Sequence, residues 1–415
     1  MAVSNSLENA HRASLPSNRA NGLDPLPATV ARCLELLEQA GFEAWLDGGY
    51  VRNCLVGCRR GHITLASNAS PEQIEELFRN AGYAVHISDK RTLSATLTSP
   101  EWPHSIQISS FHKVTKRNSQ GRACEYEMAS TIEEDLARRD FTFNAIAFHP
   151  VHGLLDPYRG TRDIRNKKIR FVGDAKERLE SEPLLALRAI RFASTLGFSI
   201  DEETKRAIAE TAPRVLALNK AYLRHQLDKF LCGTFAHDAI MEHLDFLELL
   251  LPELTPMKGF DQMSRYHCYD VLEHTAFVVN GCKAHALNRW AALLHDSGKP
   301  ETFFLDAEGR GHMPGHPTAS LTHLKTVAAR FEFDDDFTRK LALVIEHHDD
   351  RPAAKEADVR RLFENLDQDE LLFHAICDLM RADALAKAQW CQMAPIVATN
   401  EVEKLFDKMR AEGKI

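Results

Sequence analysis

The residue pattern changes near residue 155, and this change restricts the fold more than any other feature. Before it, short segments rich in β-branched residues, at 83–87, 94–99 and 105–111, predict strands. After it, amphipathic helical patterns continue to the C-terminus, for example at 184–198 and 221–233. We therefore expect an α+β domain built on a small mixed sheet with helices, followed by all-α regions.

Local signals refine the first part. Apolar residues at helical spacing predict a helix within 25–41, which ends at a glycine. AWLDGGYVRNCLVG, at 44–57, predicts a strand, a glycine turn and the start of a helix. PEQIEELFRN, at 71–80, opens on proline with early acids, which is typical of a helix N-terminus.

Membrane and disulfide-stapled classes are excluded by composition. No apolar run approaches the roughly 18 to 20 residues of a membrane span, and the first 25 residues lack the apolar centre of a signal peptide, so we expect a cytoplasmic protein. The nine cysteines are scattered and form no CxxC pair, which argues against a disulfide framework and against a thiolate zinc site.

The net charge of −8 hides a regional difference. Residues 156–229 contain 16 Lys and Arg against 11 Asp and Glu, a charge of +5, while the remainder carries −13. A nucleic-acid footprint is local, so this segment is a candidate RNA-facing strip. The alternative is an ordinary solvated helical face.

Histidine is the strongest anomaly, because nine of the 20 lie in the 85 residues from Tyr266 to Asp350. Apolar helical patterns flank most of these histidines, so several side chains can point to one place between helices. Imidazole with carboxylate suits Zn, Ni, Mn, Fe or Mg, and an open coordination position holds a water of lowered pKa. The candidate ligands, in chain order, are His274, His295, Asp296, His316, His347 and Asp383.

This ordered set resembles the HD-domain metal phosphohydrolases. The resemblance implies that one metal is held by His274, His295, Asp296 and Asp383. It also implies that His316 and His347 contact phosphate or hold a second metal. Asp296 would orient or deprotonate the attacking water, and Lys299 would meet a phosphate oxygen. We expect His312, His323 and His348 to be structural.

Four fragments, at 47–53, 135–148, 156–178 and 187–198, resemble the class II CCA-adding tRNA nucleotidyltransferase and poly(A) polymerase family. With the HD segment, the resemblance covers roughly residues 25 to 400, in family order. It implies four parts, which are a disordered tail at 1–24, a nucleotidyltransferase-like domain at 25–155, a helical RNA-binding neck at 156–255 and an HD domain at 256–415.

The resemblance also implies a nucleotide site. Its residues are Gly48, Gly49, Arg52, Arg139, Asp140, Asn144, Arg188 and Arg191. A glycine turn lets the backbone approach a triphosphate, and a helix start favours an anion. Without the family context, any tight turn explains the glycine pair, a helix end capped by charge is the better explanation of Arg139, Asp140 and Asn144, and Arg188 and Arg191 can line a solvated surface.

The three metal carboxylates that the family places at this site are missing. The aligned positions are His62, Thr64 and Gln107, which cannot supply the negative charge that two Mg²⁺ ions need for nucleotidyl transfer. The family's base-reading Glu-Asp-x-x-Arg aligns with Ser181, Glu182 and Leu185, so its arginine is lost as well. Acids nearby leave a displaced metal site open as an alternative; they are Asp47, Asp89 and Glu101.

Three hypotheses follow. The first is an HD phosphohydrolase on a degenerate nucleotidyltransferase scaffold, acting on phosphomonoesters or 2′,3′-cyclic phosphates of nucleotides or RNA 3′ ends, tRNA among them. The second is a non-catalytic RNA-binding or regulatory pseudoenzyme. The third is an active CCA-adding or A-adding enzyme with displaced carboxylates. The oligomeric state is not predicted.

Overall fold

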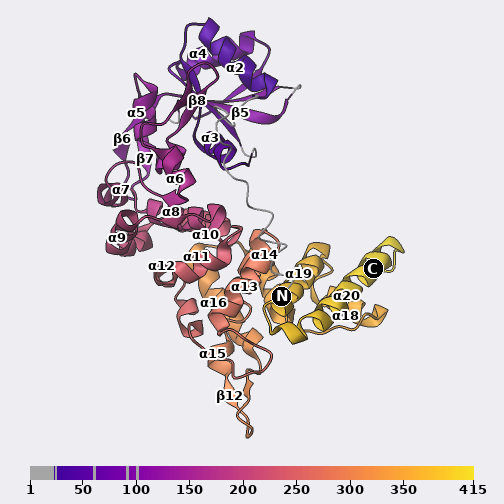
Figure 1. The fold of residues 1–415 in the computed structure, drawn as a ribbon. Helices are drawn as coiled ribbons and strands as arrows, with labels where there is room; N and C mark the ends of the chain where they lie inside the picture. The colour runs from indigo at the N-terminus through magenta and orange to yellow at the C-terminus, as the bar shows by residue number, and fades with distance from the viewer. Residues whose placement is uncertain (1–22, 24–25, 59–61, 90–92, 100–101) are drawn as a thin grey trace. The chain divides into compact units, whose positions relative to one another are not determined.

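The computed structural model describes residues 23, 26–58, 62–89, 93–99 and 102–415 (Figure 1). The predicted disordered tail, 1–24, lies outside this part apart from residue 23. Two compact units are present: one holds the chain up to Leu185 with Ser199–Thr211, and the other holds Ala186–Phe198 with Ala212–Ile415. The predicted neck is thus divided between the units, and the four-part division stays a prediction.

The first unit is built on a seven-stranded sheet with the strand order β3-β4-β5-β2-β1-β8-β9 (Figure 1). Only β2 and β5 pair in parallel; the other neighbours in the sheet are antiparallel, so the sheet is mixed as predicted. Its strands are β1 (Ala44–Asp47), β2 (Ile63–Ser67), β3 (Ala84–Asp89), β4 (Ser94–Ser99), β5 (Trp102–Ser110), β8 (Ala147–His149) and β9 (Gly153–Leu155).

Helices cover this sheet, and a separate hairpin follows it in the chain. The helix α4 packs on β3, β4 and β5, and α3 packs on β1, β2 and β8. The predicted helix at 71–80 is confirmed; Ser70 and Gln73 form a capping box around the N-terminal proline. The elements are α2 (Ala28–Gln39), α3 (Gly48–Leu55), α4 (Pro71–Asn80), α5 (Ile132–Ala137), the 3₁₀ helix η2 (Thr142–Asn144), and the hairpin strands β6 (His112–Arg117) and β7 (Ala123–Met128).

Helices dominate after residue 155, as predicted, but two short strand pairs interrupt them. The parallel pair is β10 (Lys168–Ile169) with β11 (Ser199–Ile200), and the antiparallel pair is β12 (Phe304–Leu305) with β13 (Gly311–His312). Each of these strands has only two residues, too few to show an alternating pattern in the sequence. Helices of this stretch include α6 (Gly160–Arg165), α7 (Ala175–Ser181), α8 (Leu184–Leu196), α9 (Glu202–Thr211), the 3₁₀ helix η3 (Ala212–Ala217), α10 (Lys220–Leu231), α11 (Ala236–Glu242), α12 (Leu244–Leu250) and the 3₁₀ helix η4 (Pro252–Met257).

The second unit continues as a helical bundle in which α14 and α19 pack on each other and each also packs on α13 and α17. Its core contains fully buried aromatic side chains, among them Trp290, Phe331 and Phe373. Mutual packing of these four helices brings residues far apart in the chain to one interior point. The helices are α13 (Val271–Gly281), α14 (Ala286–Leu294), α15 (Lys299–Thr302), α16 (His316–Phe331), α17 (Asp335–His347), α18 (Glu356–Asn365), α19 (Glu370–Leu385), the 3₁₀ helix η5 (Gln389–Cys391) and α20 (Met393–Ala411).

All nine cysteines lie within the described residues and all are free, as predicted. Within the described part of the chain, no helix is both long and apolar enough to cross a bilayer.

Candidate functional site

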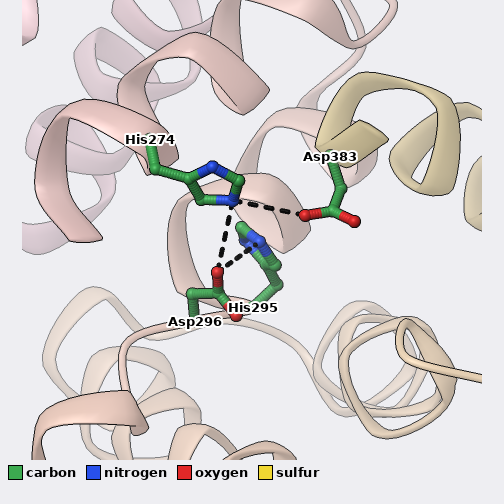
Figure 2. Close-up of side chains that lie close together, drawn as sticks. All are labelled: His274, His295, Asp296 and Asp383. Carbon is green, nitrogen blue, oxygen red and sulfur yellow. Dashed lines mark ion pairs between the residues drawn. The ribbon is translucent and has the colours of Figure 1, made fainter. Parts of the chain in front are cut away.

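Three helices bring four predicted metal ligands together. His274 lies inside α13, His295 and Asp296 follow the end of α14, and Asp383 lies near the end of α19. Figure 2 shows their side chains pointing toward one another, with His274 Nε2 3.4 Å from Asp296 Oδ2 and 3.2 Å from Asp383 Oδ1. The His295 Nε2 atom lies 3.1 Å from Asp296 Oδ2. All four side chains are buried, so the helix bundle itself holds this geometry.

A second group shares Asp296. His316, at the start of α16, places Nε2 3.3 Å from the other carboxylate oxygen, Asp296 Oδ1. His348, just after α17, has Nε2 3.7 Å from the same oxygen and 3.1 Å from His316 Nε2. Asp296 therefore stands between two sets of ligands, with one oxygen facing each set.

The structure places His348, rather than His347, beside Asp296. The imidazole of His347, predicted as a ligand, pairs instead with Asp350 at 3.0 Å and is 19% exposed. The side chain of His348, predicted as structural, is 4% exposed beside Asp296. The helical repeat explains this: the buried face of α17 carries Leu341, Val344 and Ile345, and the next position on that face is 348.

Backbone carbonyls set the orientation of all four imidazoles. The Nδ1 atoms of His295, His316 and His348 lie 2.7, 3.0 and 2.6 Å from the carbonyl oxygens three residues earlier. The Nδ1 of His274 lies 3.3 Å from the Ala386 carbonyl. A carbonyl only accepts, so each Nδ1 carries a proton, and in the neutral imidazole each Nε2 presents a lone pair, which is how metal-binding histidines are usually held.

This donor set fits a divalent cation. Among the described residues, the buried Nε2 atoms of His274 and His295 have no hydrogen-bond partner, and they face carboxylate oxygens rather than donors. Lone pairs brought together in a buried place repel one another unless a proton or a cation lies between them. Imidazole nitrogen with carboxylate oxygen suits Zn, Ni, Mn or Fe. The group can therefore hold a divalent metal.

Two lysines keep the acids ionised. Burial alone would raise the pKa of Asp296, but the neighbouring His295 and Lys299 outweigh it and hold that pKa well below its usual value. The Lys299 ammonium lies 2.7 Å from Asp296 and donates to Gln262 at 2.8 Å. Burial likewise opposes ionisation of Asp383, whose pKa is held well below its usual value chiefly by Lys387, 2.6 Å away. Both carboxylates are thus available as anionic ligands.

The site opens into a pocket of about 240 Å³. His267 and Lys387 line it together with Asp296, His316 and Asp383. Burial, followed by Lys299, lowers the pKa of His267 to about 3, so this imidazole is neutral at pH 7. His267, Gln262 and Lys387 were not among the predicted site residues, because no sequence motif marks them; the one sequence signal is the clustering of histidines between 266 and 350, which includes His267.

A separate pocket of about 280 Å³ lies in the first unit, and of the eight predicted nucleotide residues only Arg139 lines it. Thr64 on β2 and Gln107 on β5 are paired in the parallel register and both line this pocket. His62 lies exposed just before β2. The structure thus brings two of the three aligned carboxylate positions together, occupied by uncharged side chains. His112 also lines the pocket, and burial, reinforced by Arg138, lowers its pKa to about 4.

Asp47 is the one acid lining this pocket, and its carboxylate is already engaged in an ion pair within the protein. Its carboxylate pairs with Arg139, which also donates to Asp135 at 2.8 Å. Thr64 donates its hydroxyl to the Asp47 carbonyl at 2.8 Å. Of the other acids considered as substitutes, Glu101 and the side chain of Asp89 lie outside the described residues. Within the described ranges, no group of three metal-type ligands lies in this unit.

Three other predicted nucleotide residues, Arg52, Asn144 and Asp140, form a hydrogen-bonded chain. The Arg52 guanidinium donates to Asn144 Oδ1, and Asn144 Nδ2 donates to Asp140 at 2.8 Å. Gly48 has φ of +63°, and a Cβ there would lie 3.2 Å from the Arg139 guanidinium, so the turn requires glycine. The glycine turn and the polar residues around it are therefore present, but the carboxylates that the family places at positions 62, 64 and 107 are not.

The residues that align with the family's base-reading motif are engaged within the protein: Glu182 forms an ion pair and Leu185 is buried. The Glu182 carboxylate accepts from Arg117 at 2.7 Å, and Leu185 is 1% exposed. Arg188 and Arg191 lie half-buried on α8. Neither Glu182 nor Leu185 presents the acceptor and donor pair that reads a base in the family.

Asp135 stabilises the arginine pair of the first unit. It is fully buried and accepts from Arg138 at 2.8 Å, from Arg139 at 2.8 Å and from the His112 backbone at 3.1 Å. Replacing it with alanine removes the carboxylate partner of Arg138 and leaves Arg139 with Asp47 alone, so we expect Asp135→Ala to lower the free energy of unfolding by about 3 kcal/mol. Urea unfolding measures this, with the exposed neighbour Glu133→Ala as the control. Equal effects of Asp135→Ala and Glu133→Ala would contradict the stabilising role of Asp135.

The same carboxylate predicts a pH dependence. Burial opposes ionisation of Asp135, but Arg139 and Arg138 outweigh it, and its pKa lies below the usual 3.8. Its contribution is therefore present above the unfolded pKa and lost as the pH falls through the folded pKa. The difference between the Asp135→Ala variant and the wild type should shrink below about pH 4.

Family comparisons match three successive parts of the chain. The poly A polymerase head domain matches residues 44–170, the probable RNA and SrmB-binding site of polymerase A matches 197–258, and the HD domain matches 265–388. The order is the one implied by the sequence fragments.

Curated relatives support the same grouping. The chain is 34% identical over 207 residues to a CCA-adding enzyme of Geobacillus sp. (strain WCH70), covering 50% of each chain. It is 33% identical over 243 residues to an A-adding tRNA nucleotidyltransferase of Deinococcus radiodurans, covering 55% of each. The chain thus spans about half the length of the curated relatives it matches.

Solved structures share the fold. A Bacillus stearothermophilus CCA-adding enzyme in complex with CTP superposes with a TM-score of 0.65 at 20% identity, over 92% of this chain and 82% of that one. A Thermotoga maritima CCA-adding enzyme complexed with tRNA gives 0.56 at 18% identity, over 95% and 85%. With the head, RNA-binding and HD matches in family order, these findings show that the chain belongs to the class II CCA-adding enzyme and poly(A) polymerase family and carries an HD domain.

Proposed function

We propose that the chain is a metal-dependent phosphohydrolase that acts through its HD domain, and that its head domain no longer transfers nucleotides. Its substrates would be phosphomonoesters or 2′,3′-cyclic phosphates of nucleotides or RNA ends. One observation carries the proposal: four imidazole Nε2 atoms surround the carboxylate of Asp296 beside an open pocket. Metal binding of this kind suits phosphate ester hydrolysis.

The residues of the HD site would have separate roles in binding the metal and the phosphate. His274, His295, Asp296 and Asp383 hold one metal, and His316 with His348 extend the set across Asp296. When bound, a divalent cation supplies a Lewis acid that polarises a phosphoryl oxygen. Lys299, bonded to Asp296 and Gln262, orients that carboxylate, and Lys387 at the pocket wall meets a phosphate oxygen.

RNA is the macromolecular partner that we propose. The relatives are named as CCA-adding and A-adding tRNA enzymes, one of the related structures is complexed with tRNA, and the RNA-binding match at 197–258 overlaps the basic stretch 156–229. This match also favours a second candidate function, an RNA-binding protein without catalysis. Phosphate contacts weaken steeply with salt, so a tRNA mobility shift that disappears between 50 and 200 mM salt would support RNA contact.

Metal content and hydrolysis test the main proposal together. Elemental analysis of the pure chain should find a divalent metal, and added Mn²⁺ or Ni²⁺ should support hydrolysis of 2′,3′-cyclic AMP or of a generic phosphodiester. Loss of hydrolysis in EDTA, restored by the metal, is the expected result. A protein that retains no metal and is inert with every ester would refute the phosphohydrolase and favour the RNA-binding candidate.

The adjacent histidines provide a matched pair of variants. His348→Ala removes an imidazole beside Asp296, so we expect metal affinity to fall by about 10- to 100-fold. His347→Ala removes only a partner of Asp350, and its affinity should stay within about threefold of the wild type. Calorimetric titration with Mn²⁺ or Zn²⁺ measures both. The reverse order of effects would restore the assignment of the sequence analysis.

A further inference from the structure

Two aromatic side chains lie exposed together in the second unit. Tyr266 is 42% exposed and Trp390 is 64% exposed, and their ring centroids are 5.3 Å apart at an interplanar angle of 36°. The Arg265 guanidinium lies 5.0 Å from the Tyr266 ring centroid and 5.7 Å from that of Trp390. We name Arg265, Tyr266 and Trp390 the aromatic platform.

The platform is joined to the rim of the HD pocket on both sides. Ser264 and His267 line the pocket, and Arg265 and Tyr266 lie between them in the chain. Lys387 lines it as well, and the next residue, Ala388, donates its backbone N–H to the Tyr266 carbonyl at 2.9 Å. From Ser264 to Tyr266 the chain spans at most about 7 Å, so the platform begins within a few ångströms of the pocket wall.

Local bonds hold Trp390 near this rim. Gln392 donates from Nε2 to the carbonyls of Leu385 and Lys387, at 2.9 and 2.8 Å. Cys391 donates from Sγ to the Ala388 carbonyl at 3.0 Å. These contacts fix the short η5 turn that carries Trp390, so the exposed ring is positioned and costs little further ordering on binding.

The chemistry of the platform suits a nucleobase. Aromatic faces and guanidinium planes are the surfaces on which bases stack, and Arg265 adds a positive charge beside the two rings. A generic phosphomonoester has no group that would use these rings. The platform would therefore favour nucleotides over phosphate esters that lack a base, which the metal site alone would not distinguish.

Building on the proposed phosphohydrolase, we propose that the aromatic platform binds the base of a nucleotide, free or at an RNA 3′ end, whose phosphate enters the HD pocket. The substrate would thus be held at two places, with its phosphate in the HD pocket and its base on the platform. Tyr266 and Trp390 bind the base by stacking, and Arg265 contributes a cation–π contact.

Fluorescence tests this without requiring turnover. Of the four tryptophans, Trp45 and Trp290 are buried, and the Trp390→Ala variant separates the response of Trp390 from that of Trp102. In the apo chain and in the metal-loaded chain, 3′-AMP should quench the emission, whereas ribose 5-phosphate, which lacks a base, should not. Trp390→Ala should remove the quenching, and Tyr266→Ala should raise the Kd for 3′-AMP about tenfold.

Exposed apolar residues on α20 provide the matched controls. Met393 and Val397 are 64% and 47% exposed, and neither lines the pocket. Met393→Ala and Val397→Ala should leave the Kd for 3′-AMP unchanged. If they and Trp390→Ala instead change the sedimentation of the protein without affecting nucleotide binding, the rings belong to a protein-docking face and the inference is overturned.

A kinetic comparison separates this inference from the proposed function. Trp390→Ala should lower the preference in kcat/KM for 2′,3′-cyclic AMP over glycerol 2-phosphate about tenfold, through KM rather than kcat. Hydrolysis of both esters without that preference, and without quenching, overturns the platform while the phosphohydrolase stands. Quenching without hydrolysis supports the platform and refutes the phosphohydrolase.

Discussion

Asp296→Asn should abolish metal retention and lower hydrolysis of 2′,3′-cyclic AMP about a thousandfold or more. This carboxylate lies between the two ligand sets, with Oδ2 toward His274 and His295 and Oδ1 toward His316. An amide has no negative charge to balance a divalent cation and can present only one oxygen. Elemental analysis and steady-state hydrolysis in Mn²⁺ measure the two effects.

Controls distinguish this effect from damage to the fold. Asp350→Asn makes the same chemical change at an exposed acid that pairs with His347, and it should retain metal and rate. His274→Ala removes a ligand while leaving the Asp296 contact with Lys299 intact, so it should repeat the loss in a folded protein. Melting curves monitor the fold of each variant. If Asp296→Asn and His274→Ala both keep metal and activity within about threefold of the wild type, the HD cluster is not the catalytic site.

The wild-type protein should not extend a tRNA that lacks its 3′ end when supplied with ATP, CTP and Mg²⁺. We expect a rate at least about 10⁴-fold below that of a class II relative with its carboxylates, since charge neutralisation by the metals is most of this catalysis. Thr64 and Gln107 offer no charge, and Asp47 is paired with Arg139. Gel analysis of labelled tRNA measures extension.

Two variants test whether acids of the head domain are responsible for any tRNA extension that is observed. Asp140→Asn changes a predicted nucleotide residue, and Asp47→Asn removes the acid that pairs with another one, Arg139. Extension by the wild type that either variant abolishes would show that displaced carboxylates carry transfer, and the pseudoenzyme proposal for the head domain would fail. A tRNA shift without extension is the expected combination.

Local chemistry made much of the fold predictable. The helix at 71–80 begins and ends as predicted, because proline and the Ser70–Gln73 capping box define its start within a few residues. The strand, turn and helix at 44–57 were likewise predictable from the glycines. The two-residue strand pairs β10–β11 and β12–β13 were not, because their pairing depends on partners distant in the chain.

Residue identities and motifs are local properties, so they were enough to predict the order of the domains, a helical His and Asp cluster, and the lack of acids at positions 62, 64 and 107. Packing in three dimensions was needed to learn that His348 rather than His347 faces Asp296, that Asp47 is paired with Arg139, and that Tyr266 lies beside Trp390. Each of these depends on which face of an element is turned toward a segment far away in the chain. Packing of the whole unit sets that orientation, and adjacent residues such as the two histidines differ by about 100° around a helix.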